Sequence, residues 1–179
     1  MIKLIPSKWT TSDLTIEDMN ESDINEAQQL YSANFAGREL EGGHCDPSYV
    51  HNSFHNGILP ADGLQVRFRI QTIRHKAADP LIGFISIYHG YPMPSSMYIT
   101  FLCLDWDSER QGLGRQAIEQ LLSLARRMEY QELRVNVSLQ NWSELRFWTK
   151  AGFNQISGIF GDKAKLGETF ANVELVGGL

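Results

Sequence analysis

The stretch from Leu102 to Ala117 combines residues that suit the binding of an anion. It reads LCLDWDSERQGLGRQA, an apolar run, then a turn with Gly112 and Gly114, then the start of an amphipathic helix. Glycine lets a phosphate approach the backbone closely, and the first N–H groups of a helix point outward from the positive end of its dipole. Arg110 and Arg115 would add positive charge. An unliganded strand-to-helix turn is the alternative, and a lone Gly-x-Gly pair favours it.

A second stretch, Asn141 to Phe153, reads NWSELRFWTKAGF. Together the two stretches resemble the acetyl-CoA-binding core of the GNAT superfamily of N-acetyltransferases. The family's [Gln/Arg]-x-x-Gly-x-[Gly/Ala] signature matches Glu109 to Gly114, and its Asn-x-x-Ala-x-x-[Leu/Phe]-Tyr-x-Lys-x-Gly-Phe motif matches the second stretch. Motif-level similarity covers roughly Met97 to Phe160. The first stretch lacks the third glycine and the N-terminal βαβ setting of a dinucleotide fold.

The resemblance implies an α/β fold with a mixed, mostly antiparallel central sheet flanked by helices. In that fold two neighbouring strands splay apart to admit the pantetheine arm of acetyl-CoA, which is the co-substrate. The length of 179 residues favours a single domain over residues 1–179. The substrate-side helices are expected at about 20–60 and the acetyl-CoA-binding core at about 97–160, with no metal site.

Position by position, the resemblance assigns cofactor contacts to three groups of residues. Leu102 and Leu104 would offer backbone groups to the acetyl and pantetheine amides, and Asn141 would contact the pantetheine arm. The turn would hold the pyrophosphate through Arg110, Gln111, Gly112, Leu113, Gly114 and Arg115. The plain alternatives are core packing for the two leucines and helix N-capping for Asn141.

Two positions depart from the family pattern. Glu109 stands at the Gln/Arg position, so its carboxylate must turn away from the pyrophosphate or weaken binding. Trp148 stands where many relatives carry the tyrosine that protonates the departing CoA thiolate, and an indole cannot act as a general acid at neutral pH. A thiolate is a tolerable leaving group, so another donor or water can serve instead.

The group that removes the amine proton is left open by the sequence. Tyr98 lies on the central strand at about the position where some relatives carry a glutamate base. Its normal pKa near 10 makes it a better orienting group or acid than a base. Tyr88, His89, Glu41 and His44 are further candidates, each with a surface or packing role as the alternative.

The activity implied by the resemblance is N-acetyl transfer by direct attack of an amine on the acetyl thioester. The acceptor would be a primary amine of a small molecule, a peptide or a protein. Trp148 and Glu109 motivate an alternative, a GNAT module that binds acyl-CoA with little or no turnover. An unrelated nucleotide-binding enzyme is a third alternative.

Residue periodicity predicts the elements that would position these groups. Alternation from Leu64 to Gln71 predicts a half-buried strand, with its apolar residues on one face and its polar residues on the other. The other predicted strands are Asp13 to Asp18, Leu81 to Tyr88, Met97 to Leu104, Leu133 to Val137, Phe153 to Phe160 and Thr169 to Val176. The predicted helices are Ser22 to Asn34, one after Pro47, one after Gly112 and Gly114 with an apolar stripe from Ile118 to Met128, and Trp142 to Ala151.

Composition narrows the partners and the location. The formal net charge of −5 disfavours nucleic acid as the main partner. No apolar stretch approaches the roughly 20 residues of a membrane span, so no membrane association is expected. Cys45 and Cys103 lack the number and spacing of a disulfide framework or a zinc site, which favours a reducing, cytoplasmic location. A monomer and a homodimer are both compatible with the sequence.

The charge is also unevenly distributed along the chain. From Thr11 to Asp46 there are nine acidic residues and one basic residue, Arg38, a local charge of −8. Subtraction from −5 leaves +3 for the remainder. Such a run is most often a solvated face, and the alternative is a role in attracting a cationic acceptor.

Overall fold

The computed structural model describes residues 2–36, 45–77, 80–105, 108, 111–161 and 171–179. In this part of the chain the strands are β1 (Lys8–Thr10), β2 (Leu14–Asp18), β3 (Phe68–His75), β4 (Leu81–His89), β5 (Ser96–Leu104), β6 (Glu132–Ser138), β7 (Phe153–Phe160) and β8 (Asn172–Gly178). The α-helices are α1 (Ile24–Ala36), α2 (Tyr49–Asn56), α4 (Leu113–Arg127) and α5 (Trp142–Lys150). Two short 3₁₀ helices, η1 (Glu21–Asp23) and η3 (Gln65–Arg67), precede α1 and β3.

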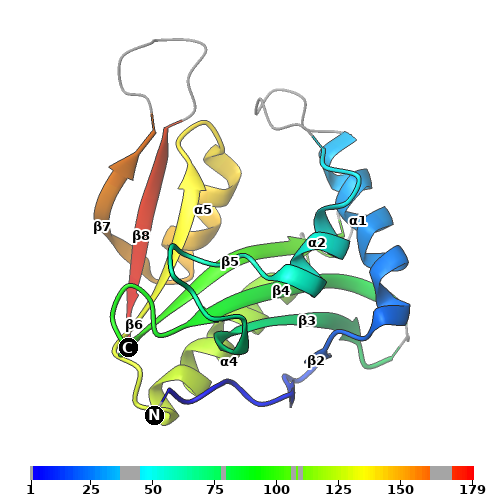
Figure 1. The fold of residues 1–179 in the computed structure, drawn as a ribbon, viewed down its shortest axis with the longest axis horizontal. Helices are drawn as coiled ribbons and strands as arrows, with labels where there is room; N and C mark the ends of the chain where they lie inside the picture. The colour runs from blue at the N-terminus through cyan, green and yellow to red at the C-terminus, as the bar shows by residue number, and fades with distance from the viewer. Residues whose placement is uncertain (1, 37–44, 78–79, 106–107, 109–110, 162–170) are drawn as a thin grey trace.

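The strands form one open sheet in the order β1-β2-β3-β4-β5-β6-β8-β7. Neighbouring strands are antiparallel except β5 and β6, which are parallel. A parallel pair needs a long crossover, and α4 supplies it between these two strands (Figure 1). The predicted mixed, mostly antiparallel α/β sheet is confirmed.

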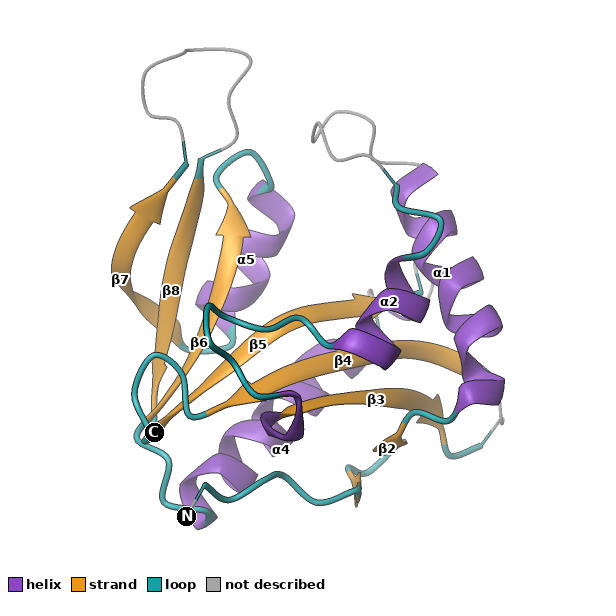
Figure 2. Cartoon of the chain, viewed as in Figure 1, coloured by secondary structure: helices purple, strands orange, loops and turns teal. Residues whose placement is uncertain are grey.

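Helices cover both faces of the sheet (Figure 2). The apolar stripe of α4, including Leu113, Ile118 and Leu121, packs with Met97 and Ile99 of β5 in the larger core. Trp148 of α5 and Trp9 of β1 belong to the same core. A smaller core on the opposite face joins α1 and α2 to the sheet, through Tyr31, Val50, Phe84 and Cys103. Side chains of β5 therefore alternate between an α4 face and an α1/α2 face.

The prediction for β3 was wrong at its start and on its polar face. The strand begins at Phe68, because Gln65–Arg67 form η3 and leave Leu64 and Val66 exposed. Gln71, expected on a solvated face, is fully buried. It is buried because the N-terminal segment, with the unpredicted strand β1, lies against this face: Trp9 Nε1 donates to Gln71 Oε1 at 2.8 Å, and Gln71 Nε2 donates to the Pro6 carbonyl at 2.9 Å.

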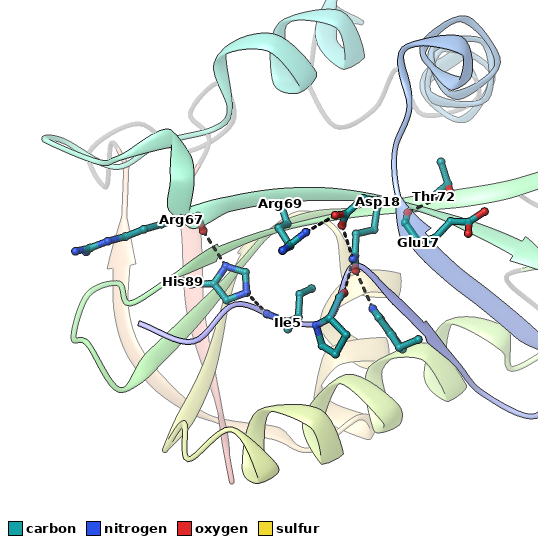
Figure 3. A network of polar contacts seen from close by, with 10 residues as sticks. Ile5, Glu17, Asp18, Arg67, Arg69, Thr72 and His89 are labelled. Carbon is teal, nitrogen blue, oxygen red and sulfur yellow. Dashed lines mark hydrogen bonds and ion pairs between the residues drawn. The ribbon is translucent and has the colours of Figure 1, made fainter. Parts of the chain in front are cut away.

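The same segment is held at its other end by His89, at the end of β4 (Figure 3). His89 is fully buried; its Nε2 accepts the Ile5 N–H at 3.1 Å and its Nδ1 lies 2.8 Å from the Arg67 carbonyl oxygen, so Nδ1 carries the proton. We call these residues the N-terminal clamp: Ile5, Pro6, Trp9, Gln71 and His89. Burial lowers the pKa of His89 to about 4, so the ring is neutral at pH 7.

Candidate functional site

The sheet opens between β5 and β6. Their parallel ladder runs only from Ser96 opposite Glu132 to Ile99 opposite Val135. Beyond that point β5 continues to Leu104 paired with β4, and β6 continues to Ser138 paired with β8. Figure 1 shows the two strands diverging from a common start. We call the space between residues 100–104 and 136–138 the fork; it is the splay that the sequence predicts.

The backbone of β5 faces the fork at the two predicted leucines. The Asp105 N–H donates to the Ile82 carbonyl of β4 at 2.8 Å, and the register places Leu104 opposite Gly83 and Leu102 opposite Ile85. Backbone polar groups alternate in direction along a strand, so those of Leu102 and Leu104 point away from β4 and toward the fork. Asn34 of α1 already donates to the Leu104 carbonyl at 2.6 Å.

A β-bulge lies where the fork begins. Ser86 of β4 is opposite Phe101, and the next residue, Ile87, is opposite Ile99, so Thr100 has no opposite residue in β4. The Thr100 hydroxyl instead lies 2.7 Å from the Ser86 hydroxyl. A bulge bends its strand and redirects side chains, and here it does so at the point where β5 leaves β6.

The predicted anion-binding turn ends at the fork. Gly112 is the N-cap of α4 with φ +77°, and a Cβ placed there would meet no described atom within 4 Å. A Cβ on Gly114, by contrast, would lie 2.7 Å from Leu104 Cδ1, so this glycine lets α4 approach β5. The first helical bond runs from Gln116 N–H to the Gly112 carbonyl, so the amides of residues 113–115 precede the ladder.

The other predicted pyrophosphate residues differ in their surroundings. Arg115 is exposed and pairs with Glu119 at 2.7 Å, and the side chain of Leu113 belongs to the larger core. Gln111 is exposed, and its N–H donates to the Ser108 carbonyl at 3.2 Å. Arg110 and Glu109 lie outside the described residues. In this turn, therefore, the described groups that suit the predicted anion are backbone amides and Arg115.

Asn141 and Trp148 lie at the two ends of α5. Asn141 is buried and caps the helix, since its Oδ1 accepts the Glu144 N–H at 3.0 Å. Trp148 is 4% exposed and packs edge-to-face against Phe147 and Phe153, with ring centroids 5.0 Å apart in each case. Asn141 has the capping role that was named as its alternative, and Trp148 is a packing residue. Contact of Asn141 with the pantetheine arm stays a prediction.

Tyr98 lies next to the last pair of the β5–β6 ladder, on the α1/α2 face. Its hydroxyl donates to Glu174 Oε2 of β8 at 3.0 Å, and Arg134 Nη1 of β6 donates to Glu174 Oε1 at 2.6 Å. We call Tyr98, Arg134 and Glu174 the fork network. Burial and the charge of Glu174 raise the pKa of Tyr98, so its hydroxyl stays protonated at neutral pH.

Sequence reasoning missed Arg134 and Glu174. A signal was present in the sequence: Glu174 is the one charged residue from Asn172 to Gly178, and its neighbours Val173 and Leu175 are apolar. A buried charge is expensive without partners, so an isolated acid in such a strand predicts a buried ion pair. Its partners, 40 and 76 residues away along the chain, are what the sequence does not identify.

The remaining candidates fall in three places. Tyr88 is opposite Tyr98 and accepts the Leu64 N–H at 2.8 Å. His89 is opposite Met97, which lies in the larger core, so His89 is on the α4 face, away from the fork network. Glu41 and His44 lie outside the described residues.

Much of the acidic segment is paired with basic residues of the sheet. Glu17 pairs with Lys8 at 2.9 Å, and Asp18 pairs with Arg69. Arg74 lies 2.8 Å from Asp23 and 3.6 Å from Glu26. Basic side chains of neighbouring strands therefore neutralise part of the local charge of −8 that the sequence shows for this segment.

The segments that form the fork and the turn also match the sequence model of a known protein family. A model described as the acetyltransferase (GNAT) family matches residues 44–153, more than half of the chain, including β5, the turn before α4, and α5. The chain belongs to the GNAT acetyltransferase family. No curated protein sequence matches it.

Solved structures share the GNAT fold at low identity. An acetyltransferase from Thermus thermophilus is 17% identical with a TM-score of 0.71, over 96% of this chain and 100% of that one. A protein of Chromobacterium violaceum named for the GNAT family is 12% identical with a TM-score of 0.76, over 98% and 88% of the two chains. A spermidine N-acetyltransferase chimera from Vibrio cholerae is 13% identical with a TM-score of 0.67, over 93% and 96%. Within the described residues, this GNAT protein has no helix with the length and apolar character of a membrane span.

Proposed function

We propose that this GNAT protein transfers the acetyl group of acetyl-CoA to a primary amine of a small molecule, a peptide or a protein. The observation that carries the proposal is the fork, where two adjacent strands separate and leave backbone groups of Leu102 and Leu104 directed into the gap. An amide-containing chain such as pantetheine can complete the missing ladder, because it offers N–H and C=O groups at a strand-like spacing.

The turn before α4 fits the pyrophosphate end of the same molecule. Gly112 is exposed, and the space above it is free of described atoms, so an anion can approach the backbone there. The first amides of α4 and the helix dipole favour negative charge at this point. Leu104 and Gly114 are in contact, so the fork and the turn are adjacent. One extended cofactor could therefore occupy both.

The chemistry is acyl transfer. The neutral amine attacks the thioester carbonyl, a C–N bond forms, the C–S bond breaks, and the amine loses a proton as the CoA thiolate leaves. A thiolate is a good enough leaving group that Trp148 need not supply a proton. A water molecule or another side chain can protonate it.

We further propose that the acceptor is cationic in solution. Aromatic rings continue along the α1/α2 face of β5: Tyr91 is 5.7 Å from Tyr98, and Phe101 is 4.9 Å from Tyr49, which stacks on Tyr31. Aromatic faces attract ammonium groups, which favours a cationic acceptor on this face. The named spermidine acceptor of one structural neighbour is consistent with a polyamine-like substrate.

The decisive experiment is a screen of primary amines with acetyl-CoA and detection of free CoA thiol. The expected result is steady thiol release that depends on one class of amine, with polyamines and lysine peptides ahead of neutral amines. Tight CoA binding without turnover across the screen would favour the alternative, an acyl-CoA-binding module, which the packing role of Trp148 supports. Binding of ATP or NAD that added CoA does not displace would favour an unrelated nucleotide-binding enzyme.

A further inference from the structure

The fork network contains a carboxylate whose hydrogen bonds fix the direction of a neighbouring hydroxyl. Glu174 is 8% exposed and lies on β8, with donors around both of its oxygens. Oε1 accepts from Arg134 Nη1 and from the Ser157 hydroxyl, and Oε2 accepts from the Tyr98 hydroxyl. Three donors around its two oxygens hold the carboxylate in one orientation.

The bond to Glu174 determines what Tyr98 can offer to a substrate. A phenol has one O–H, and in Tyr98 that O–H points at Glu174 Oε2 at 3.0 Å. The lone pairs of the phenolic oxygen are then its only means of binding a further group. Because the hydroxyl stays protonated at neutral pH, it is an acceptor of hydrogen bonds and not a strong base.

The location of Tyr98 makes this acceptor relevant to the fork. Tyr98 is the residue before Ile99, where the β5–β6 ladder ends, and it is two residues before Thr100, which the bulge leaves without an opposite residue in β4. Met97 and Ile99 face the α4 core, so Tyr98 faces the opposite side, where α1 and α2 lie. An amine that enters from that side meets the hydroxyl at the base of the fork.

We propose that Glu174 is a positioning residue that holds the Tyr98 hydroxyl as a hydrogen-bond acceptor for an N–H of the incoming amine. This inference rests on the proposed acetyl transfer. As the amine attacks the thioester, its nitrogen gains positive charge and its N–H groups become better donors. The bond to Tyr98 therefore strengthens in the transition state.

Glu132 lies outside the fork network and provides a control, because it pairs with Arg134 while the Tyr98 hydroxyl donates to Glu174. It also accepts from Arg134, through Nε at 2.7 Å, and its other described donor is Ser96 at 2.6 Å. Glu132 and Glu174 thus share the structural task of pairing with Arg134, whereas Glu174 also accepts from Tyr98. If both carboxylates were purely structural, any loss of kcat in Glu132→Gln and Glu174→Gln would follow the loss of stability in each variant.

The test compares Glu174→Gln, Glu132→Gln, Tyr98→Phe and the double variant Glu174→Gln/Tyr98→Phe in the full chain, with the best amine of the screen. Glu174→Gln and Tyr98→Phe should each lower kcat at least about tenfold, with KM for acetyl-CoA within about twofold of the parent. Glu132→Gln should stay within about twofold in kcat. The double variant should be no slower than the slower single variant, because both changes remove one interaction.

Equal kcat losses in Glu174→Gln and Glu132→Gln, or full activity in Tyr98→Phe, would overturn the positioning role. Tyr98→Phe removes a single oxygen, so it keeps the test decisive if Glu174→Gln does not fold; thermal unfolding of each variant checks this. If the parent protein turns over no amine, the proposed function fails first and this inference fails with it. If the parent is active and the variants match it, only this inference fails.

Discussion

The N-terminal clamp centres on buried polar side chains and the fork network is half-buried, and their positions suggest opposite uses. The clamp lies on the α4 face. There Gln71 and His89 of the sheet form hydrogen bonds with the N-terminal segment and hold it against the sheet. The fork network lies on the α1/α2 face, beside the point where the β5–β6 ladder ends. Burial shifts a pKa in both, in His89 and in Tyr98.

This difference shows that a shifted pKa does not by itself identify a functional residue. His89 has the more suggestive side chain, since histidine is the commonest general base. Both of its ring nitrogens, however, are engaged by the backbone of Ile5 and Arg67. The oxygen of Tyr98, by contrast, can still accept a hydrogen bond, and Tyr98 lies next to the end of the β5–β6 ladder. The proposed role of Tyr98 therefore rests on its position beside the end of the β5–β6 ladder and not on its pKa.

The largest expected effect is a loss of folding stability when acid protonates His89 in the N-terminal clamp. His89 has a pKa of about 4 when folded and about 6.5 when unfolded, so folding favours the neutral ring. Its contribution is complete above pH 6.5 and is lost as the pH falls toward 4, about 3 kcal/mol in all. Urea unfolding at pH 7 and pH 4.5 should show this loss in the parent protein.

His89→Gln is the control, because glutamine does not titrate. It should be less stable than the parent at pH 7 but lose less stability on acidification, and its CoA affinity at pH 7 should equal that of the parent. Equal acid sensitivity of the two proteins would mean that other groups dominate. Weaker CoA binding by His89→Gln at pH 7 would mean that the clamp also affects the cofactor site, contrary to the separate roles of clamp and fork.

The second effect concerns the fork side alone. Gly112→Asp introduces a negative charge where an anion is expected, so CoA affinity should fall at least tenfold, about 1.4 kcal/mol. Gly112→Asn is the matched control, because asparagine has the same shape and both residues tolerate the left-handed backbone better than most. Isothermal titration with CoA should show a loss for Asp well beyond that for Asn. Equal affinity of the two variants would exclude a pyrophosphate at this turn.

A third, smaller effect tests whether Trp148 is purely a packing residue. Trp148→Tyr and Trp148→Phe should each cost about 1 kcal/mol of stability, since the ring is buried against Phe147 and Phe153. Only tyrosine adds a proton donor at the position of the family's acid. Its kcat should exceed that of the phenylalanine variant at least about threefold, without tighter CoA binding. A large loss of kcat in both, at parental stability, would show that the indole itself serves the reaction.

The smallest expected effect is electrostatic steering of the acceptor. Exposed charges are screened beyond about 8–10 Å at physiological salt, so kcat/KM for a cationic amine should fall as salt is added while kcat changes little. The effect should be only a few-fold, because Glu17, Asp18 and Asp23 are already paired with basic residues. Glu39→Gln/Glu41→Gln should reproduce part of the loss at low salt. A flat salt dependence, or a best acceptor that is neutral, would reduce the acidic segment to a solvated surface.

The sequence by itself determined the features that depend on near neighbours. The apolar stripe of α4, the glycine turn before it and the cap at Asn141 were all predicted, because helical periodicity and capping act within a few residues. Apart from β1, the order of strands and helices followed from the same local signals. The two GNAT motifs are local as well, so the family could be named from the sequence.

Only the tertiary structure decided the features that join distant segments. The ladder of β5 and β6 ends at Ile99 and Val135 although β5 continues as mostly apolar sequence; beyond that point β5 pairs with β4 and β6 pairs with β8. Gln71 is buried by Trp9, 62 residues away, and Glu174 meets Tyr98 across 76 residues. Strand periodicity gives the face of a residue but not its partner, which depends on strand order and register. The fork network therefore could not be read from the sequence, even though each of its residues is visible there.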